Sequence, residues 1–167
     1  QPDLLPRALA ALNEHQNSIL RRDVIGLVDF WHHSREQRFQ IVDLGNGRVL
    51  ASYLVAHGRG SDPANSGWAT RFSNRPGSNA SSEGSFRTSD TYYGKHGKSR
   101  RLIGLDPQND LALQRAIVIH GADYVAPSLV AAQGRIGRSQ GCFALERKLV
   151  NEAMDQLGAG ALLFAAS

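Results

Sequence analysis

Cysteine is almost absent from this chain of 167 residues, which carries it once, at Cys142. A single cysteine excludes an intramolecular disulfide and any zinc site built on several cysteines, and it leaves a free thiol that needs a reason. Long apolar runs are also missing, since no stretch approaches the length of a membrane-spanning helix. We therefore expect no membrane span and a single domain, residues 1–167, with a hydrophobic core of its own.

The motifs of common cofactor and metal sites are missing as well. There is no Walker lysine, the segment 58–60 is too short for a dinucleotide loop, and the 6 histidines lack paired helical spacing. We expect no cofactor and no metal. A signal segment is not seen, and the chain does not begin with methionine. We expect a periplasmic or cell-envelope location after removal of a signal peptide, while the residues leave the cytoplasm open.

The charge is mildly positive, with 19 Lys and Arg against 15 Asp and Glu, a formal net charge of +4. The positive residues gather only at 95–101 and 135–138, and aromatic residues are not interleaved with them as platforms for stacking bases would be. We therefore expect no nucleic-acid partner. A substrate that carries free carboxylates fits the same charge.

Hydrophobic periodicity predicts a β-rich α+β fold, with an N-terminal helical extension at residues 1–22 and a core at residues 24–165. A turn at Gly45-Asn46-Gly47 predicts a hairpin. The polar segment 57–89 is long for a connection, which indicates a functional lid or binding loop. We expect strands at residues 24–30, 38–44, 48–56, 81–88 with 92–94, 102–106, 116–119 and 161–164, and helices at 109–116 and 145–157.

Cys142 directly follows Gly141, near the start of the predicted helix 145–157. A helix N-terminus lowers the pKa of a cysteine thiol, which would make Cys142 a nucleophile. The alternative is that this lone cysteine is a small buried hydrophobic residue, as free cysteines often are.

His120 and Gly121 come at the end of an apolar run, so the predicted strand would deliver an imidazole to a loop at the edge of a cleft. The alternative is that His120 is a histidine at a strand edge whose ring is hydrogen-bonded and has no catalytic role. Cysteine catalysis needs a thiolate, a base and donors for the oxyanion. His120 can be the base and the Gly121 carbonyl can orient it, while backbone N–H groups around Gly141 and Cys142 can form the oxyanion hole.

The pair His120-Gly121, followed after a loop by Ser139-x-Gly141-Cys142, resembles the active-site signature of the YkuD-type L,D-transpeptidase catalytic domain. The segments 57–60, 81–86 and 93–97 are similar to the murein L,D-transpeptidase branch, and the resemblance covers residues 24–165. It implies a β-sandwich-like core with flanking helices and a capping loop.

The resemblance also implies a function. Cys142 would attack the L-to-D peptide bond of a peptidoglycan tetrapeptide stem and pass the resulting thioester to an amine, with His120 as base and acid. Ser139 would help to shape the site, and the substrate-binding residues would be Tyr93, Arg138, Gln140 and His57. Peptidoglycan stem peptides are the expected partner. The expected oligomeric state is a monomer. Two alternatives stay open: an L,D-carboxypeptidase, in which water takes the acyl group, and a non-catalytic wall-binding module.

Two positions depart from the pattern that the chain resembles. The pattern has histidine between the serine and the glycine, where this chain has Gln140, and Asn or Arg two residues after the cysteine, where it has Ala144. We expect these departures to alter the support of the thiolate and the grip on the substrate's carboxylates.

Overall fold

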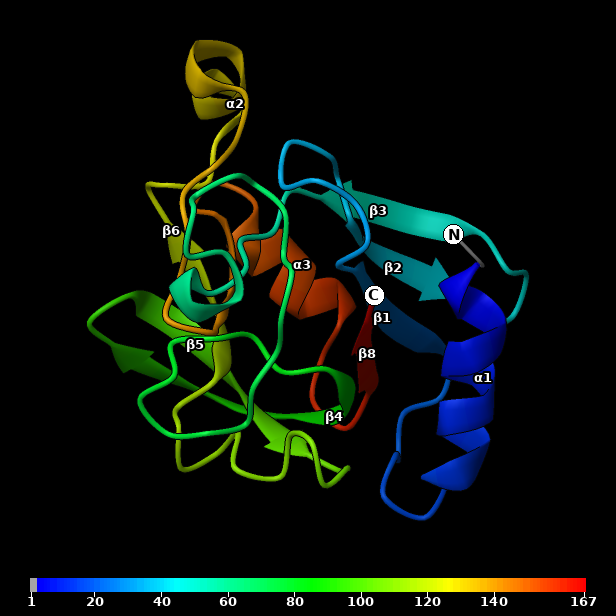
Figure 1. The fold of residues 1–167 in the computed structure, drawn as a ribbon. Helices are drawn as coiled ribbons and strands as arrows, with labels where there is room; N and C mark the ends of the chain where they lie inside the picture. The colour runs from blue at the N-terminus through cyan, green and yellow to red at the C-terminus, as the bar shows by residue number, and fades with distance from the viewer. Residues whose placement is uncertain (1–2) are drawn as a thin grey trace.

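Eight strands form one mixed sheet in residues 3–167, the part of the chain that the computed structural model describes (Figure 1). Residues 1 and 2 of the predicted N-terminal extension lie outside it. The spatial order is β3 (Val49–Tyr53), β2 (Phe39–Asp43), β1 (Val24–Asp29), β8 (Leu162–Ala166), β4 (Gly84–Gly94), β5 (Gly97–Gly104), β6 (Val118–Ala122) and β7 (Phe143–Glu146). The β1–β8 and β6–β7 pairs are parallel, and the other pairs are antiparallel.

The sheet curls until its two edges approach each other. The segment that follows β3 lies beside β7, because the N–H of Ala56 donates to the carbonyl of Ala144 and the N–H of Ser139 donates to the carbonyl of His57, both at 2.9 Å. Helix α3 (Val150–Gln156) packs inside the curve, between the two halves of the sheet (Figure 1). This arrangement confirms the predicted β-sandwich-like core.

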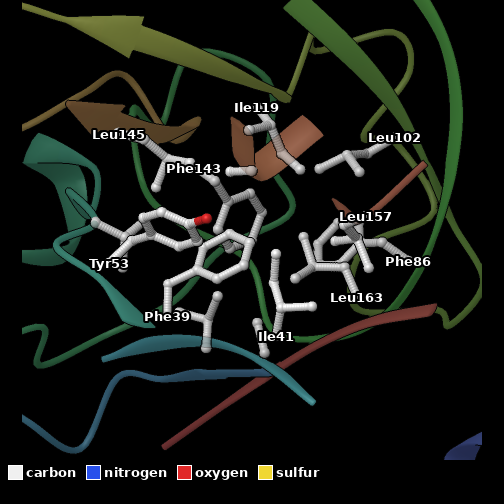
Figure 2. Close-up of a cluster of buried hydrophobic side chains, with 14 of the residues drawn as sticks. Phe39, Ile41, Tyr53, Phe86, Leu102, Ile119, Phe143, Leu145, Leu157 and Leu163 are labelled. Atoms are coloured by element: carbon white, nitrogen blue, oxygen red, sulfur yellow. The ribbon is translucent and has the colours of Figure 1, made fainter. Parts of the chain in front are cut away.

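The interior of the curve is filled by aromatic and aliphatic side chains from every strand and from α3 (Figure 2). Phe143 lies near its centre, with its ring stacked on Phe30 at a centroid distance of 6.0 Å and edge-on to Phe86 at 5.4 Å. Such ring pairs add to the free energy gained from burial, by about 0.5–1.5 kcal/mol each. Phe143 therefore fixes the start of β7, directly after Cys142.

Two further helices lie outside the curve. Helix α1 (Leu4–Glu14) packs Leu4, Ala8 and Ala11 against the other face of β1 and β8, and the Asp3 carboxylate caps it by accepting from the N–H of Leu5 at 3.0 Å. Helix α2 (Pro127–Gln133) projects away from the sheet (Figure 1). No helix in residues 3–167 has the length and apolarity needed to cross a bilayer.

Most of the predicted strands are present. Residues 24–30, 38–44 and 48–56 contain β1, β2 and β3, the predicted hairpin joins β2 to β3, and the predicted final strand is β8. The predicted segments at 81–94 contribute to β4, and the segment at 102–106 contributes only the end of β5.

Of the two helices predicted around the candidate site, 145–157 is present in part, as α3, and 109–116 forms no helix. Residues 143–146 form strand β7 and the helix begins only at Val150, because Phe143 and Leu145 face the core while Ala144 is buried on the opposite side. Burial on both faces leaves a pattern that resembles a helix. Residues 109–116 form turns that end at Ala116, whose φ is +55°.

Candidate active site

Cys142 and His120 line one cleft of about 570 Å³. Its walls come from the β6 and β7 region, the tip of the β4–β5 hairpin and the long connection after β3. Three other predicted site residues, Arg138, Ser139 and Gln140, lie in the same wall as Cys142. The structure thus brings together five of the predicted positions.

The parallel register of β6 and β7 explains why the cysteine and the histidine face the same cleft. Ile119 pairs with Phe143 and His120 pairs with Ala144, so one step back places Cys142 beside Val118. Side chains alternate between the two faces of a sheet, and Ile119 and Phe143 point into the core. His120 and Cys142 therefore share the opposite face as diagonal neighbours. His120 lies in the middle of β6, not at its C-terminal end as predicted.

The surroundings of the Cys142 thiol differ from the sequence-based prediction. No helix begins at this residue, so no helix dipole lowers its pKa. Instead burial raises the pKa of the Cys142 thiol, an effect that the N–H of Val118 and the positive charges of Arg115 and Lys95 oppose. The Sγ–H group donates to the carbonyl of Ala116 at 3.3 Å. These surroundings favour the thiol form of the sulfur, which could act as a nucleophile only if a base took its proton.

His120 is 1% exposed and has the properties of such a base. Its Nδ1 lies 2.9 Å from the carbonyl oxygen of Gly121, the acceptor expected from the sequence, which assigns the proton to Nδ1 and leaves a lone pair on Nε2. Burial lowers the pKa of His120 to about 4 against the effect of the Gly121 carbonyl, and His96, Arg147 and Lys95 lower it further. At neutral pH the ring is an acceptor.

Ser139 organises the turn between the two parts of the motif. Its hydroxyl donates to the carbonyl of Cys142 at 2.7 Å and accepts from the N–H of Gly141 at 3.1 Å. Gly141 has a φ of +113°, and a Cβ there would lie 2.6 Å from the carbonyl oxygen of Ala80, so only glycine fits. The Gly141 N–H expected in the oxyanion hole is thus bound to Ser139 in the resting site.

The described lining of the cleft carries four cationic side chains and no Asp or Glu; the cations are Arg59, Lys95, Arg115 and Arg138. Arg115 is held by the carbonyls of Ser73 and Ala80, and Arg138 by the carbonyl of Asp62 at 2.6 Å. Such a lining attracts carboxylate groups.

Two of the predicted substrate-binding residues lie elsewhere. Tyr93 is 81% exposed and is not in the cleft lining, whereas its neighbour Tyr92 is. His57 is 1% exposed, so it cannot meet a substrate. It bridges two buried charged groups: Arg38 donates to its Nδ1 at 2.7 Å, and its Nε2 donates to Asp62 at 2.9 Å.

Sequence reasoning missed several residues of the cleft: Tyr92, Lys95, His96, Arg115 and Tyr124. The segment 93–97 resembles the family's sequence, but nothing in the sequence places the tip of the β4–β5 hairpin over His120. One group of side chains in residues 3–167 has the types and spacing to hold a metal ion, namely Glu14, His15 and Asp106. None of them lines the cleft of Cys142.

The comparisons with known proteins agree with this architecture. The sequence profile described as "L,D-transpeptidase catalytic domain" matches residues 1–166. No curated protein matches the chain.

Solved structures with a similar fold include an L,D-transpeptidase from Mycobacterium smegmatis, with 15% identity over 87% of this chain and a TM-score of 0.51. L,D-transpeptidase 3 from Mycobacterium tuberculosis, with a faropenem-derived adduct, has 12% identity over 87% and a TM-score of 0.53. An L,D-transpeptidase from Stackebrandtia nassauensis has 14% identity over 89% and a TM-score of 0.51. This chain covers 59%, 60% and 58% of those three chains, respectively.

Proposed function

Because this chain belongs to the L,D-transpeptidase catalytic domain family, we propose that it cleaves the L-to-D peptide bond of peptidoglycan tetrapeptide stems and transfers the acyl group to an amine. Cys142 is the nucleophile and His120 is the base and acid. The observation that carries the proposal is that the chain's one thiol and a buried neutral histidine share one face of the sheet and one cleft.

The resting protonation states define the first step. The thiol of Cys142 carries its proton, and His120 Nε2 carries a lone pair. The S–H bond breaks as the Nε2–H bond forms, and the sulfur electron pair attacks the carbonyl carbon of the scissile bond. When the C–N bond breaks, Nε2–H protonates the departing amine of the terminal D-residue. A thioester remains on Cys142, and His120 is neutral again.

The second step repeats the transfer with a new nucleophile. The amine of a second stem's diamino acid attacks the thioester, His120 takes up the proton of that amine, and the same proton returns to the sulfur as the thiolate leaves. The cationic lining supports a substrate with free carboxylates. Because the substrate is a component of the wall, the proposal places the protein in the cell envelope.

The test is incubation with a disaccharide tetrapeptide, followed by mass spectrometry of the products. We expect a cross-linked dimer, free terminal D-residue and a mass adduct on Cys142, and none of these with Cys142→Ala. Tripeptide without any dimer would replace transfer by hydrolysis, the L,D-carboxypeptidase alternative. A protein that forms neither product nor adduct, and binds peptidoglycan equally well as Cys142→Ala, would be a wall-binding module.

A further inference from the structure

His96 contributes a second imidazole to the site from a distant part of the chain. It lies in the two-residue turn that joins β4 to β5, where Gly94 pairs with Gly97. Its ring is stacked on the ring of His120, with a centroid distance of 4.0 Å and an angle of 10° between the planes. Both histidines line the cleft of Cys142. One face of the candidate base is therefore covered by another histidine.

The position of this imidazole is unexpected, because the motif that the chain resembles has its additional histidine next to the glycine. Here that position is Gln140, which is exposed at the cleft. In this chain the second imidazole comes instead from the tip of the β4–β5 hairpin. It covers the ring face of His120 and is distant from Cys142 in the sequence.

The stack leaves His120 few ways to change its orientation or its charge. The Nδ1 edge is held by the carbonyl of Gly121, and the ring face is held by His96. A flat ring at this distance excludes water from the face that it covers, which disfavours the charged form of His120. If His96 itself took up a proton, two like charges would lie about 4 Å apart, which again opposes the charging of His120.

The other groups around the stack act in the same direction. Lys95 lies in the turn of His96, and Arg147, which is paired with Asp123 at 2.6 Å, follows β7. Burial, Lys95 and Arg147 all lower the pKa of His96. Tyr92 from β4 and Tyr124 after β6 line the same cleft, as does Arg115 beside the thiol. The described lining brings no carboxylate to the pair, so the charged form of His120 is favoured only by the carbonyl of Gly121 among the groups named here.

Resting on the proposed function, we propose that His96 is a positioning residue of the Cys142–His120 pair. Its ring fixes the plane of His120 and keeps that ring neutral, so that Nε2 waits with its lone pair and the proton stays on sulfur until a substrate binds. His96 touches neither the thiol nor the reacting carbonyl in this role, and it acts only through His120.

The test uses two truncations, His96→Ala and His96→Gln, against His96→Phe, which keeps a flat ring of similar size that cannot be charged. His32→Ala is the matched control, because His32 is an exposed histidine outside the cleft. The primary readout is the NMR titration of the His120 side chain, and the second is the rate of Cys142 alkylation by iodoacetamide between pH 5 and pH 9. Neither readout needs a peptidoglycan substrate.

We expect His120 to titrate about one pH unit or more higher in the two truncations, toward the value of a free histidine. Because a more basic imidazole takes the thiol proton more readily, alkylation at pH 7 should be about tenfold faster. In the pH profile of turnover, the fall in rate on the acid side should begin at a higher pH than in the wild-type protein. The variant His32→Ala should match the wild-type protein in all three measurements, and His96→Phe should restore the His120 titration and the alkylation profile toward the wild-type values.

An unchanged titration of His120 and an unchanged alkylation profile in both truncations would overturn the inference. A change in thermal stability alone would likewise reduce His96 to a structural residue. These outcomes are separate from the proposed function, which is lost if the wild-type protein forms no cross-linked dimer, whatever the behaviour of the His96 variants.

Discussion

The thiol of Cys142 donates a hydrogen bond to the carbonyl oxygen of Ala116, at a distance of 3.3 Å. Ala116 is held in the left-handed region, with a φ of +55°, a conformation that costs a non-glycine residue about 1–2 kcal/mol. The strained turn thus presents a carbonyl to the sulfur. This carbonyl accepts a bond from the thiol, and it would repel the thiolate. These surroundings therefore favour the protonated form of the Cys142 thiol at rest.

The alkylation of Cys142 should follow this resting state. Because burial raises the pKa of the thiol, we expect the rate of reaction with iodoacetamide to be low at neutral pH and to rise only in the alkaline range. Mass spectrometry at a series of pH values measures the rate. The control is the same chain in denaturant, whose alkylation rate should begin to rise at a lower pH than that of the folded protein. A rate that is already at its plateau below pH 7 would contradict the expectation.

Replacement of His120 should remove the base without removing the fold. For His120→Ala we expect turnover of a tetrapeptide stem to fall by a factor of about 10² to 10⁴, the usual contribution of general acid–base catalysis. Circular dichroism checks the fold, and His120→Gln, which preserves more of the side-chain volume, should show the same loss. His32→Ala is the control with full activity. Turnover within threefold of the wild type in both His120 variants would show that another base serves.

Gly141 should tolerate no side chain. A left-handed φ costs alanine about 1–2 kcal/mol, and in Gly141→Ala the new Cβ also meets the carbonyl oxygen of Ala80 at 2.6 Å. Gly134→Ala is the matched control, because Gly134 has a φ of +76° with no atom within 4 Å of its Cβ position. We expect urea denaturation to show a loss for Gly141→Ala well above the loss for Gly134→Ala. Equal losses would mean that the close approach to Ala80 is relieved without cost.

The Ser139 hydroxyl should matter because it both donates and accepts a hydrogen bond. Ser139→Ala leaves the N–H of Gly141 and the carbonyl of Cys142 without these bonds, at a cost of about 1–3 kcal/mol in stability. Turnover should fall as the turn loosens. Ser82→Ala is the control, since the buried Ser82 hydroxyl has no partner within residues 3–167, and we expect its stability to be unchanged. Similar unfolding curves for both variants would contradict a stabilising role of the Ser139 hydroxyl.

Acid should destabilise the protein through its buried neutral histidines. Burial and the charge of Arg38 lower the pKa of His57 to about 4 against the opposing effect of Asp62, whereas a histidine in the unfolded chain titrates near 6.5. As the pH falls between these values only the unfolded state takes up the proton, so the stability present above pH 6.5 is lost, by about 3 kcal/mol for one such group.

The same argument applies to His120, whose pKa is also about 4. In His57→Gln the amide can accept from Arg38 and donate to Asp62, so we expect about half of the pH dependence between pH 6.5 and pH 4 to disappear. Chemical denaturation at four pH values measures this, with His32→Gln as the control. If the free energy of unfolding of His57→Gln depended on pH as steeply as that of the wild type, the hydrogen bonds of His57 to Arg38 and Asp62 would not be the origin of the pH dependence.

The sequence was sufficient to pair Cys142 with His120, because each is a chemically distinctive residue beside a glycine. It also predicted strands β1, β2, β3 and β8, where alternation or a buried run is clear. It did not predict β7, because both faces of this strand are buried and the alternation is lost.

Other errors arose where a side chain's direction depends on distant parts of the chain. The register of β4 and β5 shifts between Thr88 and Thr91, which decides that Tyr92 and not Tyr93 faces the cleft. His57 looked like a loop histidine, but its partner Arg38 lies on another segment of the chain. The stack of His96 on His120 depends on the position of the hairpin tip in the folded protein, and no local sequence pattern predicts that position.

The position of β8 has a consequence for the order in which the parts of this domain are made. This strand, residues 162–166, pairs with β1 on one side and with β4 on the other, and so joins the half of the sheet containing β1 to the half containing β4. A ribosome delivers residues 162–166 after all the residues of the cleft. Cys142 and His120 are therefore synthesised before the strand that joins the two halves of the sheet, so the sheet around them is complete only once residues 162–166 are available for pairing.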